Sequence, residues 1–124
     1  MIWDMLAFAE KVNLRLLNSS TWDSTTEHEW KVPAGKRWFI YGGMVNRSDS
    51  ATLIIEYRDT GDNLMMRLVS ESAATGPFSW PESSYKVWTG LPLILDPGEH
   101  IRFTFGVAQG AAAYITGVAL EANV

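Results

Sequence analysis

Histidine is the first residue type to consider, because it can act as a general base or a metal ligand near neutral pH. The chain has only two histidines, His28 and His100, which lie far apart in the sequence. A metal site built on them would need a third ligand, and neither an HxH nor an HExxH pattern occurs. We therefore expect structural roles for both, with His28 at the beginning of a strand and His100 just after a turn.

Carboxylates are the second candidates, because a suitably spaced pair can hydrolyse a glycosidic bond. One of them, Glu56, is expected on a strand. The others lie in expected turns, where Asp and Glu ordinarily stabilise the turn itself: Asp59, Asp62, Asp96 and Glu99. The segment RDTGDN faintly resembles a calcium loop, but it lacks the ligand spacing and the terminal bidentate Glu.

Other catalytic signatures are missing from the sequence. The chain has no cysteine, which excludes a thiol nucleophile, a disulfide framework and a Cys-ligated metal. Neither a GxSxG elbow nor a phosphate-binding glycine loop followed by Lys-Ser/Thr occurs. We therefore predict that the protein is not an enzyme and has no catalytic residues, no metal site and no cofactor.

Tryptophan is the most informative remaining residue type, since six occur in 124 residues. Three uses are open: packing in the core and loops, anchoring a protein–protein interface, or stacking on sugar rings. Trp22 and Trp80 fall in polar segments expected to be loops, so they are the least expected in a plain core. Together with Tyr85, they would be the stacking residues of a carbohydrate-binding module.

The elements that would position these side chains are β-strands. In residues 91–106, LPLILDPGEHIRFTFG, apolar residues alternate on both sides of a Pro-Gly turn, which is typical of an antiparallel hairpin with one buried face. Pro97 sets φ for a type II turn and Gly98 supplies the positive φ that follows. Similar patterns along the chain predict about eight strands. The predicted fold is an all-β antiparallel β-sandwich, jelly-roll-like.

Two further patterns concern the middle of the chain. Residues 37–45 are apolar on both faces, which indicates a central strand with an added layer, or an interface. Gly42 and Gly43 within it suggest a bulge or a close backbone approach. Residues 46–50 and 70–84 are expected to be loops. The corner VPAGKRWFIYGG resembles LDPGEHIRFTFG, which suggests equivalent strands in two facing sheets.

The chain divides into an N-terminal arm, residues 1–10, and a β-sandwich domain, residues 11–124. The arm is a short helix or irregular segment that is apolar on more than one side. Two arrangements are open: the arm folds back on its own domain, or it docks on a neighbouring subunit. The predicted docking residues are Ile2, Trp3, Met5, Leu6 and Phe8.

The composition of the chain limits the partners and the cellular location that we expect for the protein. The net charge of −4 spreads over the chain without a basic run, which predicts no direct binding to nucleic acid. No stretch is long enough to span a membrane, and Asp4 with no basic leader argues against a secretory signal. The lack of cysteine fits a reducing cytoplasm or a particle assembled there.

Three segments occur in order: VPAGKRWFI, then a strand–DTGD–strand hairpin, then PLILDPGEHIRF before a last short strand. Over residues 27–121 this pattern resembles small β-sandwich virion proteins of tailed bacteriophages, of the capsid decoration (cement), head-fibre or tail accessory type. The resemblance implies a non-enzymatic role and self-association into a trimer or other small ring. It also implies attachment to a major capsid or tail protein, in a virion assembled in the host cytoplasm. The alternative is a carbohydrate-binding β-sandwich module for host or glycan adhesion.

Overall fold

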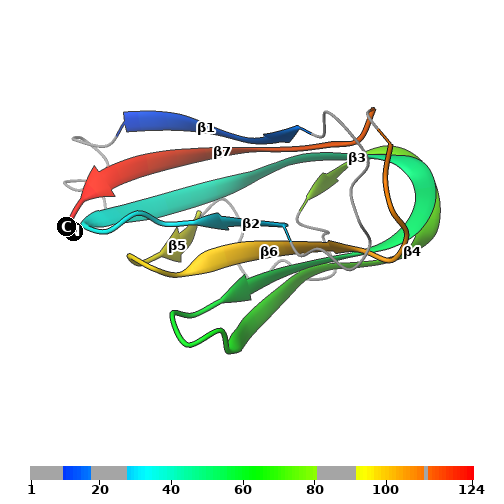
Figure 1. Ribbon diagram of the computed structural model, residues 1–124. Helices are drawn as coiled ribbons and strands as arrows, with labels where there is room; N and C mark the ends of the chain where they lie inside the picture. The colour runs from blue at the N-terminus through cyan, green and yellow to red at the C-terminus, as the bar shows by residue number, and fades with distance from the viewer. Residues whose placement is uncertain (1–9, 18–27, 81–91, 111) are drawn as a thin grey trace.

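The computed structural model describes residues 10–17, 28–80, 92–110 and 112–124 (Figure 1). All regular structure in these ranges is β-strand: β1 (Glu10–Leu17), β2 (His28–Lys31), β3 (Lys36–Arg58), β4 (Leu64–Trp80), β5 (Leu93–Leu95), β6 (His100–Phe105) and β7 (Tyr114–Asn123). The strands form one antiparallel sheet in the order β1-β7-β3-β6-β2, with β4 and β5 both paired to β3. The prediction of an all-β antiparallel fold is confirmed. In the described part of the chain, no helix has the length and apolarity that crossing a bilayer requires.

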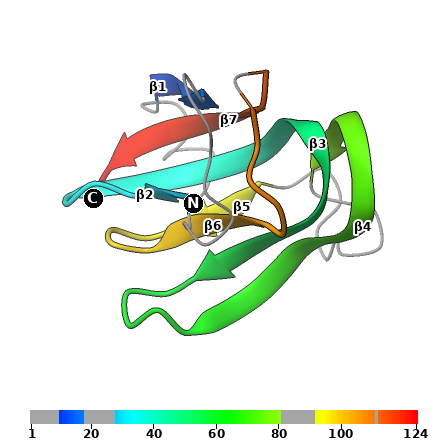
Figure 2. The same ribbon diagram turned by 45° about the vertical axis from the view of Figure 1, so that its right-hand side comes forward.

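The sheet folds into two layers because β3 is long enough to belong to both. Residues 36–46 of β3 pair with β7, and residues 53–58 pair with β6. β4 pairs with both halves of β3 and follows it through the bend (Figures 1 and 2). We call β1, β7, β5 and the adjoining parts of β3 and β4 the first layer. The second layer is β2, β6 and the remaining parts of β3 and β4.

The continuous β3 corrects the expected division of this region. Residues 46–50, expected to be a loop, lie within β3, and β4 extends through most of the loop expected at 70–84. Polar and small residues adopt strand geometry here because pairing with neighbouring strands outweighs their weak intrinsic preference. The described residues hold seven strands, whereas about eight were expected along the whole chain. The jelly-roll-like arrangement stays a prediction.

The core lies between the two layers and takes alternate residues from each strand. On β6, for example, Ile101, Phe103 and Phe105 are buried members of the core, as the period of two requires. At the centre, the ring of Trp30 lies 4.7 Å from that of Phe103, edge to face, and Trp80 lies 5.9 Å from both. Aromatic pairs of this kind contribute about 0.5–1.5 kcal/mol each beyond their buried area.

Two adjacent glycines allow β3 to pass β7. The register shifts between Ile40 and Gly42, which leaves Tyr41 as the extra residue of a bulge. Gly42 has a φ of 114°, a conformation that favours glycine. A Cβ on Gly43 would collide with the backbone of Thr116 on β7. The sequence predicts a bulge or a close approach at this pair, and the structure shows one of each.

The two Pro-Gly corners lie side by side at one end of the molecule. Gly35 and Gly98 both have positive φ, 75° and 84°. The Val32 N–H donates to the Glu99 carbonyl at 2.9 Å, and the Gly98 N–H donates to the Val32 carbonyl at 3.0 Å. The first corner leads into the first layer and the second leads into the second layer. The predicted equivalence of the strands that follow the corners stays a prediction, since β3 has 23 residues and β6 has six.

The first described strand, β1, opens the domain expected from residue 11 onward. It pairs with β7 along its whole length, from Glu10 opposite Glu121 to Leu17 opposite Tyr114. β1 therefore begins at the same end of the molecule as the two corners, since Asn123 of β7 lies opposite Lys36 of β3. Residues 1–9 lie outside the described residues, so the boundary between arm and domain stays a prediction.

Candidate functional site

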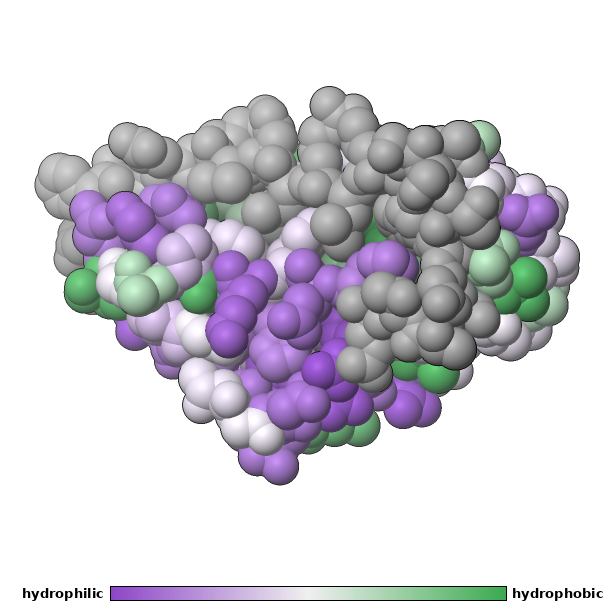
Figure 3. Space-filling view, in the orientation of Figure 1, coloured by the Kyte–Doolittle hydropathy of each residue, from purple (hydrophilic) through white to green (hydrophobic). Residues whose placement is uncertain are grey.

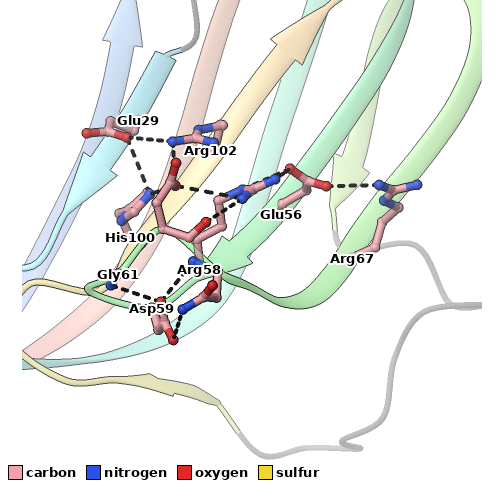
Figure 4. Close-up of polar contacts among 10 residues, drawn as sticks. Glu29, Glu56, Arg58, Asp59, Gly61, Arg67, His100 and Arg102 are labelled. Atoms are coloured by element: carbon pink, nitrogen blue, oxygen red, sulfur yellow. Dashed lines mark hydrogen bonds and ion pairs between the residues drawn. The ribbon is translucent and has the colours of Figure 1, made fainter.

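A row of alternating charges crosses the outer face of the second layer. Glu29 of β2 lies opposite Arg102 of β6, Arg102 opposite Glu56 of β3, and Glu56 opposite Arg67 of β4. Residues opposite one another in register share a face of the sheet, so these four side chains lie next to one another (Figure 4). We call them the charge row. Figure 3 shows hydrophilic residues gathered where β2 and β6 lie.

Glu56 is the best-satisfied member of the charge row. It is 6% exposed, and its carboxylate accepts hydrogen bonds from Arg58 at 2.9 and 3.1 Å and from Arg67 at 2.9 Å. Burial by itself raises the pKa of the Glu56 carboxyl, but the hydrogen bonds and charges of Arg67 and Arg58 outweigh it and hold that pKa below 4.5. Glu56 is therefore ionised at neutral pH and is not suited to act as a general acid.

Asp62 reaches from the β3–β4 turn onto the neighbouring strand. Its φ of 62° is left-handed, which is uncommon for a residue other than glycine. Its carboxylate accepts from Arg102 at 2.6 Å and lies 3.2 Å from His100 Nε2, and its carbonyl accepts from Arg58 at 2.7 Å. Desolvation raises the pKa of Asp62, but Arg102, His100 and Arg58 together lower it. The contacts with Arg102 and His100 hold the β3–β4 turn against β6.

The other turn carboxylates stabilise local structure. The Asp59 carboxylate accepts from the N–H groups of Gly61 and Asn63, both at 2.9 Å, in the pattern of an Asx turn. The bond from the Asn63 backbone is the largest influence on the pKa of Asp59, which is lowered. Glu99 accepts from the Tyr57 hydroxyl at 2.9 Å. The oxygens considered for a calcium loop or a hydrolytic pair are thus engaged within the fold.

The two histidines lie apart in the sheet. His28 is opposite Phe103, and His100 is opposite Lys31. His100 is 6% exposed, with Nε2 lying 3.5 Å from Glu29 in addition to its contact with Asp62. Burial lowers the pKa of His28. Among the described residues, no group of three or more His, Asp or Glu side chains is placed to hold a metal ion.

The outer face of the first layer carries apolar side chains that water reaches. Phe39 lies between the core residues Trp38 and Ile40 and points to the other side of the strand, where it is completely buried. After the bulge, Val45 is in the core and Met44 is exposed. An uninterrupted alternation along residues 37–45 would place Met44 on the same side as Trp38 and Ile40, and the extra residue of the bulge puts it on the opposite side.

We define the apolar face by its four exposed members, which share the outer side of the first layer: Tyr41 (46%), Met44 (37%), Ile94 (42%) and Val118 (39%). Register places them on neighbouring strands. Ile94 lies opposite Phe39, and Val118 lies opposite Gly42, next to Tyr41. The four residues come from β3, β5 and β7 and lie on the same side of the sheet.

A shallow hollow of about 460 Å³ lies between the two Pro-Gly corners. Among the described residues, it is lined by Lys31, Val32, Pro33, Ala34, Pro97 and Gly98. In Figure 3, apolar residues appear at the left end of the molecule, where Figure 1 shows the β2–β3 turn. We call this feature the corner hollow.

The described tryptophans all belong to the core. Trp30, Trp38 and Trp80 are 6%, 5% and 3% exposed. Trp80 Nε1 donates to the Thr116 carbonyl at 3.0 Å, and its ring packs against Trp30 and Phe103. The assignment of Trp80 as a sugar-stacking residue is corrected accordingly, because the loop expected around it is a strand and no face of its ring is open.

The remaining predicted site residues lie outside the described part of the chain. They are the two other stacking candidates, Trp22 and Tyr85, and the five predicted docking residues of the arm, Ile2, Trp3, Met5, Leu6 and Phe8. Sequence reasoning missed the charge row and the corner hollow. Both depend on strand register, and the only available signal was the likeness between the two corners.

Comparison with known proteins identifies no family. No family model and no curated protein matches the chain. Its fold is similar to the nucleoplasmin-like N-terminal domain of Drosophila FKBP39, with 14% identity over 95% of this chain and 93% of that one and a TM-score of 0.47. It is also similar to the Drosophila NLP core, with 11% identity over 91% of this chain and 95% of that one and a TM-score of 0.39. A third similar structure is a pentameric capsid protein from metagenomic phage sequences, with 16% identity over 92% of this chain and 64% of that one and a TM-score of 0.39. At these values, the likenesses carry no functional argument.

Proposed function

We propose that this chain is a non-enzymatic structural protein of a virion, a capsid decoration or cement protein or a similar accessory protein, that self-associates and binds neighbouring capsid or tail subunits. The observation that carries the proposal is the apolar face, with four half-exposed apolar side chains on three neighbouring strands. Contiguous exposed apolar surface on a small domain is typical of an interaction site. The assignment to a bacteriophage particle rests on the order of turns and strands in residues 27–121.

The polar side of the molecule supports a structural role. Glu56 and Asp62 are ionised carboxylates held by arginines, and both have lowered pKa values. A general acid or base needs a pKa near the working pH and a free path to the substrate proton. The charged groups instead engage one another: Arg67 and Arg58 hold Glu56, and Arg102 pairs with Glu29 and Asp62. In this proposal, these contacts join neighbouring strands of the second layer.

Self-association would bury the apolar face. Burial contributes about 25 cal/mol per Å² of apolar surface before the costs of association are deducted. Closed cyclic or two-fold symmetry uses the same surface on every copy and leaves no growing end. The predicted arm, residues 1–10, adds a second contact by docking its apolar residues on a neighbouring subunit.

Native mass spectrometry of the purified chain tests self-association. We expect a discrete small oligomer for the wild type, and monomers for the variant Val118→Glu with an unchanged far-UV circular dichroism spectrum. Val107→Glu is the matched control, since Val107 is 47% exposed but lies outside the apolar face. A monomeric wild type, or a Val118→Glu variant that still assembles, would overturn the role of the apolar face.

Two further measurements test the arm and the location. A variant lacking residues 1–9 keeps β1 intact and should be a folded monomer; a variant that assembles normally would refute the arm's role. Mass spectrometry of purified phage particles should detect this chain in a fixed ratio to the major capsid or tail protein. Particles of the encoding phage without the chain would refute the virion assignment.

A further inference from the structure

The corner hollow is a mostly apolar depression with one cation, Lys31, at its rim. Val32, Pro33, Ala34 and Pro97 supply the apolar lining, and Lys31 stands beside them. Its volume of about 460 Å³ is within the range of about 300–1,000 Å³ that is typical of binding pockets. The hollow suits an apolar or aromatic side chain followed by a negative charge.

Lys31 differs from the other described cations near this end of the molecule. Lys36 donates to Asn123 at 2.6 Å, and Arg37 pairs with Asp96 at 2.7 Å. Lys31 is exposed and has no ion-pair partner among the residues that the structure describes. An acidic group from outside the described residues would therefore complete the rim.

The arm has the matching chemistry. Asp4 is the only charged side chain in residues 1–9, and it directly follows Trp3. Tryptophan is the side chain that most often anchors an interface when it fills a pocket. An indole followed by a carboxylate is thus the complement of an apolar hollow beside a lysine.

Geometry allows a neighbouring copy to supply this segment. β1 begins at Glu10, at the same end of the molecule as the corners. In a cyclic oligomer, all copies present the same end at the same height. An arm that leaves one copy at its corner end therefore meets the corner end of the next copy.

We infer that the corner hollow is the receptor site for the arm of a second copy of this chain, with Trp3 seated in the hollow and Asp4 paired with Lys31. The inference rests on the proposed function, because it names the surface on which the proposed arm docks. It predicts that the two charges act as a pair and that the contact is made between chains.

The absence of cysteine permits a direct cross-linking test. A mixture of the single variants Asp4→Cys and Ala34→Cys, oxidised after assembly, should give a disulfide-linked dimer that contains one chain of each. A mixture of Asp4→Cys with Thr75→Cys is the control, because Thr75 is exposed on β4 and does not line the hollow. Absence of the mixed dimer overturns the inference. So does a double variant, Asp4→Cys with Ala34→Cys, that cross-links only within one chain.

Association measurements test the chemistry of the contact. Lys31→Glu should lower the association constant about fivefold, the upper end of what an exposed ion pair contributes, and more salt should reduce the difference. The double variant Lys31→Glu with Asp4→Lys should recover the wild-type association constant. The control is Lys36→Glu, which makes the same change of charge at a residue that does not line the hollow. Trp3→Ala should lower the association constant about thirtyfold. If the double variant associates no better than Lys31→Glu alone, the pairing of Asp4 with Lys31 is overturned.

The outcomes separate this inference from the proposed function. If removal of residues 1–9 abolishes assembly but no mixed cross-link forms, the arm docks elsewhere and only the receptor site is refuted. If assembly survives that removal, the arm's role in the proposed function fails as well. A mixed cross-link together with charge rescue supports both.

Discussion

The side chain of Gln109 pairs with both backbone groups of Asp49. The Asp49 N–H donates to Oε1 at 3.3 Å, and Nε2 donates to the Asp49 carbonyl at 3.1 Å. Gln109 is completely buried. Asp49 lies in the bend of β3, where the register with β4 shifts between Arg47 and Ala51. The amide of Gln109 therefore takes the place of a paired strand where β3 passes from one layer to the other.

Replacing Gln109 with Ala should lower the free energy of unfolding by about 2 kcal/mol, because the backbone groups of Asp49 lose their partners and a buried space is left. Urea denaturation followed by circular dichroism measures the change. Thr75→Ala, at an exposed position on β4, should have an effect below about 0.5 kcal/mol. Equal effects of the two substitutions would show that the amide does not hold the bend.

Replacing Glu56 with Gln should destabilise the protein at neutral pH by about 2–3 kcal/mol, since two arginines lose a buried ionic partner. The pKa of Glu56 is lower in the folded state than its ordinary value of 4.5. Its contribution is therefore complete above that value and is lost as the pH falls below it.

The pH dependence of stability distinguishes the loss of the ionised Glu56 from a general destabilisation by the substitution. The difference between wild type and Glu56→Gln should shrink as the pH falls below about 4.5. Glu71→Gln is the matched control, on the neighbouring strand β4 and outside the charge row. A difference that stays constant down to low pH would contradict the assignment of an ionised, paired Glu56.

Replacing Tyr57 with Phe should change the stability of the protein in alkali. Burial and the hydrogen bond to Glu99 raise the pKa of the Tyr57 phenol above its ordinary value of 10.0. The phenol therefore stabilises the fold fully below pH 10 and loses that contribution as the pH rises through its folded-state pKa. Urea titrations at pH 7 and above pH 10 should show a loss in the wild type that is smaller in Tyr57→Phe. Identical alkaline profiles would refute the pairing.

Replacing Gly43 with Ala should destabilise the protein by about 3 kcal/mol, because the new methyl group collides with the β7 backbone at Thr116 and forces β3 and β7 apart. Thermal unfolding measures the effect. Gly61→Ala is the control, since its nearest obstacle is the movable Asn63 side chain at 3.1 Å. A Gly43→Ala variant as stable as Gly61→Ala would show that the close approach is not required.

Local patterns in the sequence were enough to predict the all-β class, the Pro-Gly turns and the irregularity at Gly42-Gly43. The hairpin expected across residues 91–106 is wrong, because β5 pairs with β3 while β6 pairs with β2 and β3, so the turn at Pro97-Gly98 connects the two layers. The expected loop at 46–50 is wrong because its polar residues lie in strand geometry imposed by partners far away in the sequence.

The site depended on information that the sequence does not hold in local form. Glu56 was noted as a carboxylate on a strand, but its partnership with Arg67 follows from the register of β3 and β4. Trp80 was placed in a loop because its neighbours are small and polar, and pairing of that segment with β3 carried it into the core. In both cases, the sequence does not show which residues lie opposite one another on neighbouring strands.

The course of β3 through both layers has a mechanical consequence. A single covalent backbone connects the outer surface that bears Tyr41 and Met44 with the one that bears Glu56. We therefore expect a load applied to one of these surfaces to reach the other along a single strand, without passing through a turn.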